Sequence, residues 1–107
     1  MTKVVVEAGI CGFTTTVEVS KLARRKVKVV ITSPCEKITK LGGSLTEVDQ
    51  WEIFKKHLDC DIYLTAARCQ LHVTCPVPIA VLKAIEVETE LALPRDVVIR
   101  FESTEHK

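Results

Sequence analysis

The feature that most constrains the fold is a set of three β-branched runs at residues 3–7, 14–19 and 26–32. In the third run, Val27, Val29 and Ile31 occupy every second position, which is the period of a strand with one buried face. Gly9 and Gly12 stand between the first two runs and indicate a turn or a bulge there. The first third of the chain therefore predicts an antiparallel meander of three strands.

The next segment carries the signals of a helix start. Ser33 is predicted to be the N-cap, Pro34 the first helical residue and Glu36 the end of a capping box. Gly42 and Gly43 are expected to end this short helix.

Further helices are predicted along the rest of the chain. Thr46 would open a helix over 46–58, in which Trp51, Phe54 and Leu58 form a core stripe at helical spacing. Residues 61–70 are compatible with a short helix. A longer helix begins after residues 75–78, where both prolines fall in the first turn, and it runs to about residue 92. Its predicted buried stripe is Val77, Val81, Ala84, Ile85 and Ala92.

Residues 96–101 read as a last strand, after Leu93 and Pro94 end the long helix. The predicted order of strands, then helices, then a strand favours an α+β fold of two layers. With 107 residues, the chain fits a single domain over 1–107 that can bury a core of its own.

Composition excludes several classes of partner. The formal net charge is +1, so no field across the molecule would attract nucleic acid or an anionic membrane. The basic cluster at residues 21–28 is expected to be a solvated turn. No apolar stretch has the length of a signal peptide or of a membrane span, and the protein is therefore expected to be cytoplasmic.

The five cysteines are the main functional signal. In a reducing compartment they are expected to be free thiols, which are candidates for metal binding or sulfur chemistry. Cys11 falls in a turn at a strand end, and Cys35 and Cys75 fall at helix starts, where unpaired amides and the helix dipole favour a thiolate. Because strand ends and helix starts can share one edge of a two-layer fold, we predict that these three thiols form one site.

A fourth ligand would come from Cys69 or His72, which precede Cys75 by six and three residues. The chain has no tight C-x-x-C pair of the kind typical of zinc sites, so zinc and an iron–sulfur cluster both remain possible. Cys60 is expected to be either a small buried hydrophobe or simply exposed.

The placement of Cys11-Gly12, Cys35 and Cys75 resembles the U-type iron–sulfur cluster assembly scaffolds of the IscU/NifU family. In that family the first cysteine precedes a glycine in a turn, the second starts a helix after a later strand, and the third starts a long helix. The resemblance implies a scaffold-like α+β fold, a cluster on three cysteines, and a sulfur donor or an acceptor apoprotein as partner.

This sequence departs from the scaffold pattern at two positions. The family has an aspartate two residues after its first cysteine, which makes a bound cluster labile enough to transfer, and this chain has Phe13 at that position. The family also has a histidine directly before its third cysteine, where this chain has Thr74. A retained cluster, with Cys69 or His72 as the fourth ligand, fits these changes at least as well as transient assembly.

Two further resemblances concern short strings. Residues 75–78, Cys-Pro-Val-Pro, resemble the helix start of the TusA/SirA sulfur-relay family, which implies a persulfide carrier with a lowered thiol pKa as the alternative function. Residues 11–16, 75–78 and 91–97 look like a small uncharacterised family from anaerobic bacteria and archaea, which implies no known activity. A plain interaction module is the third possibility.

No motif for an enzyme is present in the sequence. There is no Ser-His-Asp set and no phosphate-binding loop, and residues 9–12 lack the strand–GxGxxG–helix context that a dinucleotide requires. We therefore expect a binding protein rather than an enzyme.

Overall fold

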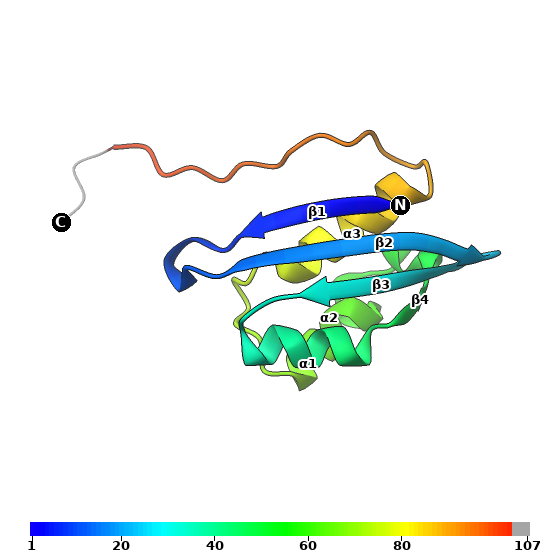
Figure 1. Cartoon of the computed structure of the whole chain (residues 1–107), viewed down its shortest axis with the longest axis horizontal. Helices are drawn as coiled ribbons and strands as arrows, with labels where there is room; N and C mark the ends of the chain where they lie inside the picture. Colours follow the sequence, from blue (N-terminus) through cyan, green and yellow to red (C-terminus); the bar gives the residue numbers. More distant parts are fainter. Residues whose placement is uncertain (104–107) are drawn as a thin grey trace.

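A computed structural model describes residues 1–103 and shows an α+β fold built on one antiparallel sheet. The strands are β1 (Thr2–Glu7), β2 (Thr14–Ala23), β3 (Lys26–Thr32) and β4 (Glu47–Asp49), in that spatial order. The predicted three-stranded meander is confirmed, and β4 extends it on the β3 side (Figure 1).

The register of the meander places the valines of neighbouring strands opposite one another. Val4 pairs with Val17 across β1 and β2, and Val19 pairs with Val29 across β2 and β3. Val17, Val19 and Val29 are almost completely buried, whereas Lys28 and Val30 on the other face of β3 are exposed. The sheet therefore has one core face, as the alternation predicts.

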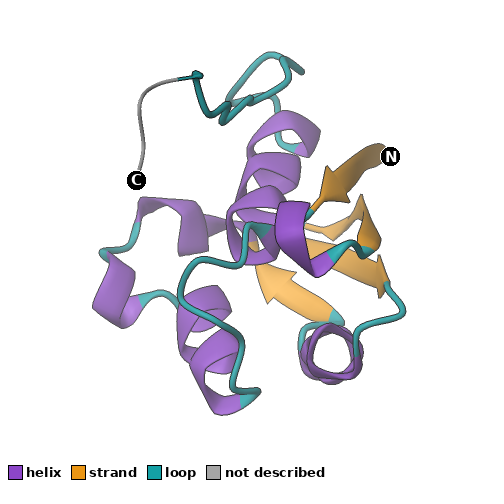
Figure 2. Cartoon of the chain, turned by 90° about the vertical axis from the view of Figure 1, so that its left-hand side faces the viewer, coloured by secondary structure: helices purple, strands orange, loops and turns teal. Residues whose placement is uncertain are grey.

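Three α-helices cover this core face and form the second layer (Figures 1 and 2). They are α1 (Glu36–Ser44), α2 (Asp61–Arg68) and α3 (Val77–Glu88). Helix α3 packs against β1 and β2, and α1 packs against β3. The buried side of α3 includes Val81, Ala84 and Ile85, which confirms the predicted stripe of that helix.

The start and end of α1 differ from the prediction. Cys35, not Ser33, is the N-cap residue, and the helix continues through Gly42 and Gly43 to Ser44. Ser33 is used elsewhere because its Oγ accepts hydrogen bonds from the Thr15 hydroxyl and the Cys35 amide. The capping box assigned to Ser33 and Glu36 is therefore wrong.

The helix predicted over 46–58 is also wrong. The segment forms β4, then the 3₁₀ helices η2 (Gln50–Phe54) and η3 (His57–Asp59). Pairing with β3 takes residues 47–49 into the sheet, where Val48 is buried opposite Val27. Trp51, Phe54 and Leu58 are 51%, 65% and 88% exposed, so they form no core stripe.

The predicted last strand is absent from the described part of the chain. Helix α3 ends at Glu88, and residues 91–103 have no regular secondary structure and exposed side chains. Ala92, which the sequence placed on the buried face of the long helix, lies in this exposed segment. The segment 96–101 has the composition of a strand but pairs with no strand in the described structure.

Two surface properties follow from the fold. The basic cluster lies in the exposed β2–β3 turn, where Arg25 forms a 3.0 Å salt bridge with Asp49 and lies over the Trp51 ring. Among residues 1–103, no helix has the length and apolar character needed to cross a membrane.

Candidate thiol site

The segments that carry Cys11, Cys35 and Cys75 lie at the same end of the molecule. They are the β1–β2 turn, the start of α1 and the start of α3, which gather at the left-hand end of Figure 1 and face the viewer in Figure 2. Thiols separated by 24 and 40 residues in sequence are thereby brought to one edge of the two layers.

Cys11 is the most accessible of these thiols. It ends the 3₁₀ helix η1 (Gly9–Cys11), in which the Gly12 amide donates to the Gly9 carbonyl at 2.9 Å. Gly9 and Gly12 both have positive φ, at 80° and 74°, a conformation that glycine adopts without steric cost. The side chain of Cys11 is exposed and available to a ligand.

Cys35 is held by a chain of hydrogen bonds that reaches into the sheet. The buried Thr15 hydroxyl donates to Ser33 Oγ at 2.9 Å, and the Cys35 amide donates to the same Oγ at 3.2 Å. The Cys35 carbonyl accepts from the Thr39 amide at 2.9 Å. Thr15 is the second residue of β2, which follows the turn that carries Cys11. These hydrogen bonds therefore link that turn to the segment that carries Cys35.

Cys75 is half-buried and lies just before α3. Its amide closes a turn by donating to the His72 carbonyl at 2.9 Å. Burial raises the pKa of the Cys75 thiol, the Val77 amide that donates to the sulfur lowers it, and Cys35 and Cys11 raise it again. The net direction is upward, so the lowered pKa expected for this helix start is wrong.

Cys35 and Cys11 each act electrostatically on Cys75, so both thiols lie within interaction range of the Cys75 sulfur. As they stand, however, no three His, Cys, Asp or Glu side chains within residues 1–103 are grouped as metal ligands. Binding of an ion by these thiols would therefore require them to move closer together, and the exposed Cys11 has the most room to move.

The two candidates for a fourth ligand differ in exposure. Cys69 is the C-cap residue of α2 and packs partly against the core, whereas His72 is exposed in the loop before α3. Neither residue is among those that shift the pKa of Cys75. Cys60 is buried in the core, in agreement with the first of its two expected placements.

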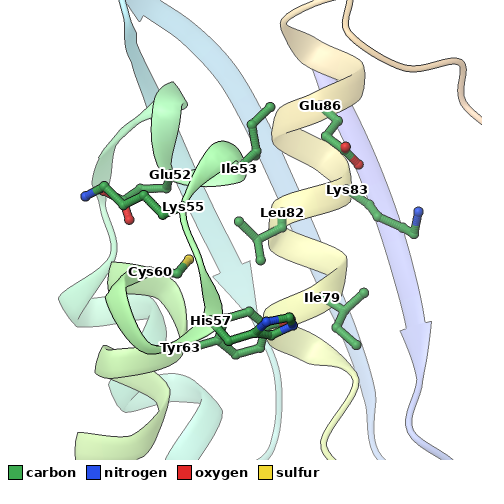
Figure 3. Close-up of a pocket in the computed structure, with 10 residues that line it drawn as sticks. All are labelled: Glu52, Ile53, Lys55, His57, Cys60, Tyr63, Ile79, Leu82, Lys83 and Glu86. Atoms are coloured by element: carbon green, nitrogen blue, oxygen red, sulfur yellow. The ribbon is translucent and has the colours of Figure 1, made fainter.

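A separate pocket of about 260 Å³ lies between η2, η3, α2 and α3 (Figure 3). Glu52 and Lys55 lie on one side of it, and His57 lies against Tyr63, with 5.4 Å between the ring centroids. No pattern in the sequence predicts this pocket, because it depends on the two 3₁₀ helices of a segment whose apolar spacing predicts one α-helix.

The buried carboxylate of this pocket already has partners. Glu52 is buried, accepts a hydrogen bond from the Asp61 amide at 2.7 Å, and forms a 2.6 Å salt bridge with Lys55. Its carboxylate therefore stabilises the start of α2, the helix that has Cys69 as its C-cap residue. Within the described residues, no buried side-chain nitrogen or oxygen lacks a hydrogen-bond partner.

Comparison with known proteins gives one match. No curated protein and no solved structure matches the chain. The model of a family of unknown function matches residues 2–101, which include all five cysteines. This chain therefore belongs to the family of unknown function DUF6951.

Proposed function

We propose that this protein binds a zinc ion or an iron–sulfur cluster through Cys11, Cys35 and Cys75. The observation that carries the proposal is that three segments distant in sequence lie at one end of the molecule (Figure 2), where Cys11 and Cys35 both act electrostatically on Cys75. Cys69 or His72 would complete four ligands.

The chemistry of the three side chains suits these cofactors. Thiolates are soft ligands that select zinc and iron–sulfur clusters over hard cations such as magnesium. Neighbouring thiols disfavour one another's ionisation, but a bound cation reverses that effect and holds all of them as thiolates. The Val77 amide beside the Cys75 sulfur would remain as a hydrogen-bond donor to the ligand.

The position after the Cys11-Gly12 turn bears on whether a cluster is retained. Phe13 is partly exposed there and supplies no carboxylate, so the turn offers no acidic side chain to loosen a bound cluster. We therefore favour a retained cofactor over a transferred one. A sulfur donor or an acceptor apoprotein would be the partner if transfer does occur, and the reducing cytoplasm would keep the five thiols free.

The test is the metal content of protein purified without oxygen. We expect either iron with acid-labile sulfide and visible absorption, or about one zinc per chain. Separate C11S, C35S and C75S variants should each lose most of the bound metal. The matched control is C60A, which removes a thiol that is buried in the core and is not among the residues that shift the pKa of Cys75.

Two results would contradict the proposal. One is wild-type protein that is colourless and free of metal after anaerobic purification. The other is metal content that falls as much in C60A as in the three site variants, because the thiols at the shared end would then have no special role.

Sulfur relay is the second candidate function, and one observation favours it. The Val77 amide donates to the Cys75 sulfur at the start of α3, which would also stabilise a persulfide. The upward shift of the Cys75 pKa acts against it. This candidate requires an added mass of about 32 Da on Cys75 in protein from cells, and it requires C11S and C35S to keep that modification.

A further inference from the structure

The C-terminal segment, defined here as residues 96–101, has the composition of a strand, lies on the surface and pairs with no strand in the described part of the chain. It runs in the same direction as β1 along one side of the molecule (Figure 1). Its apolar residues Val97, Val98, Ile99 and Phe101 are between 58% and 93% exposed. Such a segment of exposed β-branched and aromatic residues is typical of a strand that pairs with another chain.

Within residues 1–103, no strand pairs with the neighbouring edge of the sheet either. Strand β1 is the last strand on its side, and Val5 on it is 59% exposed. A groove of about 520 Å³ separates β1 and α3 from the C-terminal segment, and Val4, Val6, Ile79, Val97 and Ile99 contribute its apolar lining. The groove therefore lies between two unpaired strand edges.

We propose that the occupant of this groove is the C-terminal segment of a second copy of this chain. In the resulting two-fold dimer, each C-terminal segment would lie between the partner's β1 and the partner's C-terminal segment. The two sheets would join into one continuous antiparallel sheet. This inference does not depend on metal binding by the cysteines.

Charge complementarity supports a second copy as the occupant. When two copies of the segment pair antiparallel about Val98, Asp96 lies opposite the partner's Arg100, and the same pair recurs across the two-fold axis. Val97 then lies opposite the partner's Ile99. The sequence Asp-Val-Val-Ile-Arg is thus complementary to itself in both charge and apolar character.

The edge of β1 fits the same strand. Because the C-terminal segment runs parallel to β1 in one chain, the segment of a two-fold partner runs antiparallel to β1 (Figure 1). An antiparallel register that places Lys3 opposite the partner's Glu102 places Val6 opposite the partner's Ile99. The added strand therefore continues the valine-rich core face of the sheet.

The rival arrangement is closure of the segment onto β1 of its own chain. That closure would pair one edge of the segment but expose its other edge as the new end of the sheet. In the dimer, both edges of each segment are paired. This difference favours the second copy over the chain's own segment.

The experiment is a charge exchange in the full chain, read by light scattering during size-exclusion chromatography with reductant present. We expect wild-type protein to have twice the chain mass. D96R and R100D alone should each be monomeric, because positions 96 and 100 then carry like charges. An equimolar mixture of D96R and R100D should recover the dimer, because each variant supplies the charge that the other lacks.

Circular dichroism of the two variants provides the control for folding. Asp96 and Arg100 are exposed and lie outside the packed layers, so both variants should keep the wild-type spectrum. A wild-type monomer at high protein concentration would overturn the proposal, and slow amide exchange at 96–101 in that monomer would identify closure onto its own β1. A dimer that D96R and R100D leave intact would overturn it as well.

Discussion

At the scale of single residues, buried polar groups decide local structure that apolar patterning does not reveal. Ser33 was predicted to cap a helix, but its hydroxyl instead links Thr15 in the sheet to the amide of Cys35. Glu52 is buried, and its carboxylate accepts a hydrogen bond from the amide of Asp61, the first residue of α2, nine residues away. These roles depend on contacts between distant segments, and a single sequence contains no local signal for them.

Replacing Glu52 with alanine should destabilise the protein. The Asp61 amide and the Lys55 ammonium would lose their acceptor, and a hydrogen bond to a charged group contributes about 1.5–3 kcal/mol. Urea unfolding should show this loss for E52A, whereas the exposed control E47A should change the free energy of unfolding by less than about 0.5 kcal/mol. Equal effects of the two variants would mean that Glu52 has no special structural role.

Glu88 should make part of the stability depend on pH. Its carboxylate accepts from the Thr2 hydroxyl at 2.7 Å, and this hydrogen bond holds the pKa of Glu88 below its usual value. A lowered folded-state pKa contributes stability above the unfolded pKa of about 4.3, and that stability is lost as the pH falls through the folded value.

The matched variant for this prediction is E88Q. At neutral pH it should be less stable than wild type by about 1 kcal/mol, and the difference should shrink as the pH falls below about 4. Urea unfolding at several pH values measures this change. A difference that is constant with pH would exclude ionisation of Glu88 as its cause.

At the scale of elements, the strands were predictable and several boundaries were not. The alternation in 26–32 is a local signal, and β3 covers those same residues. Residues 46–58 show helical spacing of apolar side chains, yet pairing of Val48 with Val27 places part of the segment in the sheet. Partner strands lie far away in sequence, so tertiary pairing can override a local pattern.

The two glycines in α1 give a prediction at this scale. A Cβ on Gly43 would meet no atom within 4 Å, so G43A should stabilise the protein by about 0.5–1 kcal/mol. A Cβ on Gly42 would lie 3.2 Å from Ile31 Cβ, and G42A should therefore gain less than G43A or lose stability. Thermal unfolding of both variants measures the contrast. Destabilisation by G43A would contradict continuation of α1 through these glycines.

At the scale of the whole molecule, the fold brings together parts of the chain that the sequence keeps apart. The sequence predicted that Cys11, Cys35 and Cys75 occupy similar places at the ends of elements, and the structure has them in a strand-end turn, at an N-cap and just before a helix. How close the three thiols lie to one another depends on how the two layers stack, and no local sequence pattern predicts that stacking. The exposed position of the C-terminal segment could not be predicted either, because its composition predicts a strand within the sheet.

The most direct test of the central claim is protection of Cys11 by metal. In reduced, metal-free protein, the exposed Cys11 should react rapidly with iodoacetamide, and peptide mass spectrometry can follow each cysteine separately. Saturation with zinc should slow the alkylation of Cys11, Cys35 and Cys75 together, by at least about tenfold. In C75S, zinc should no longer protect Cys11. Alkylation of Cys11 at the same rate with and without zinc would contradict a shared thiolate site.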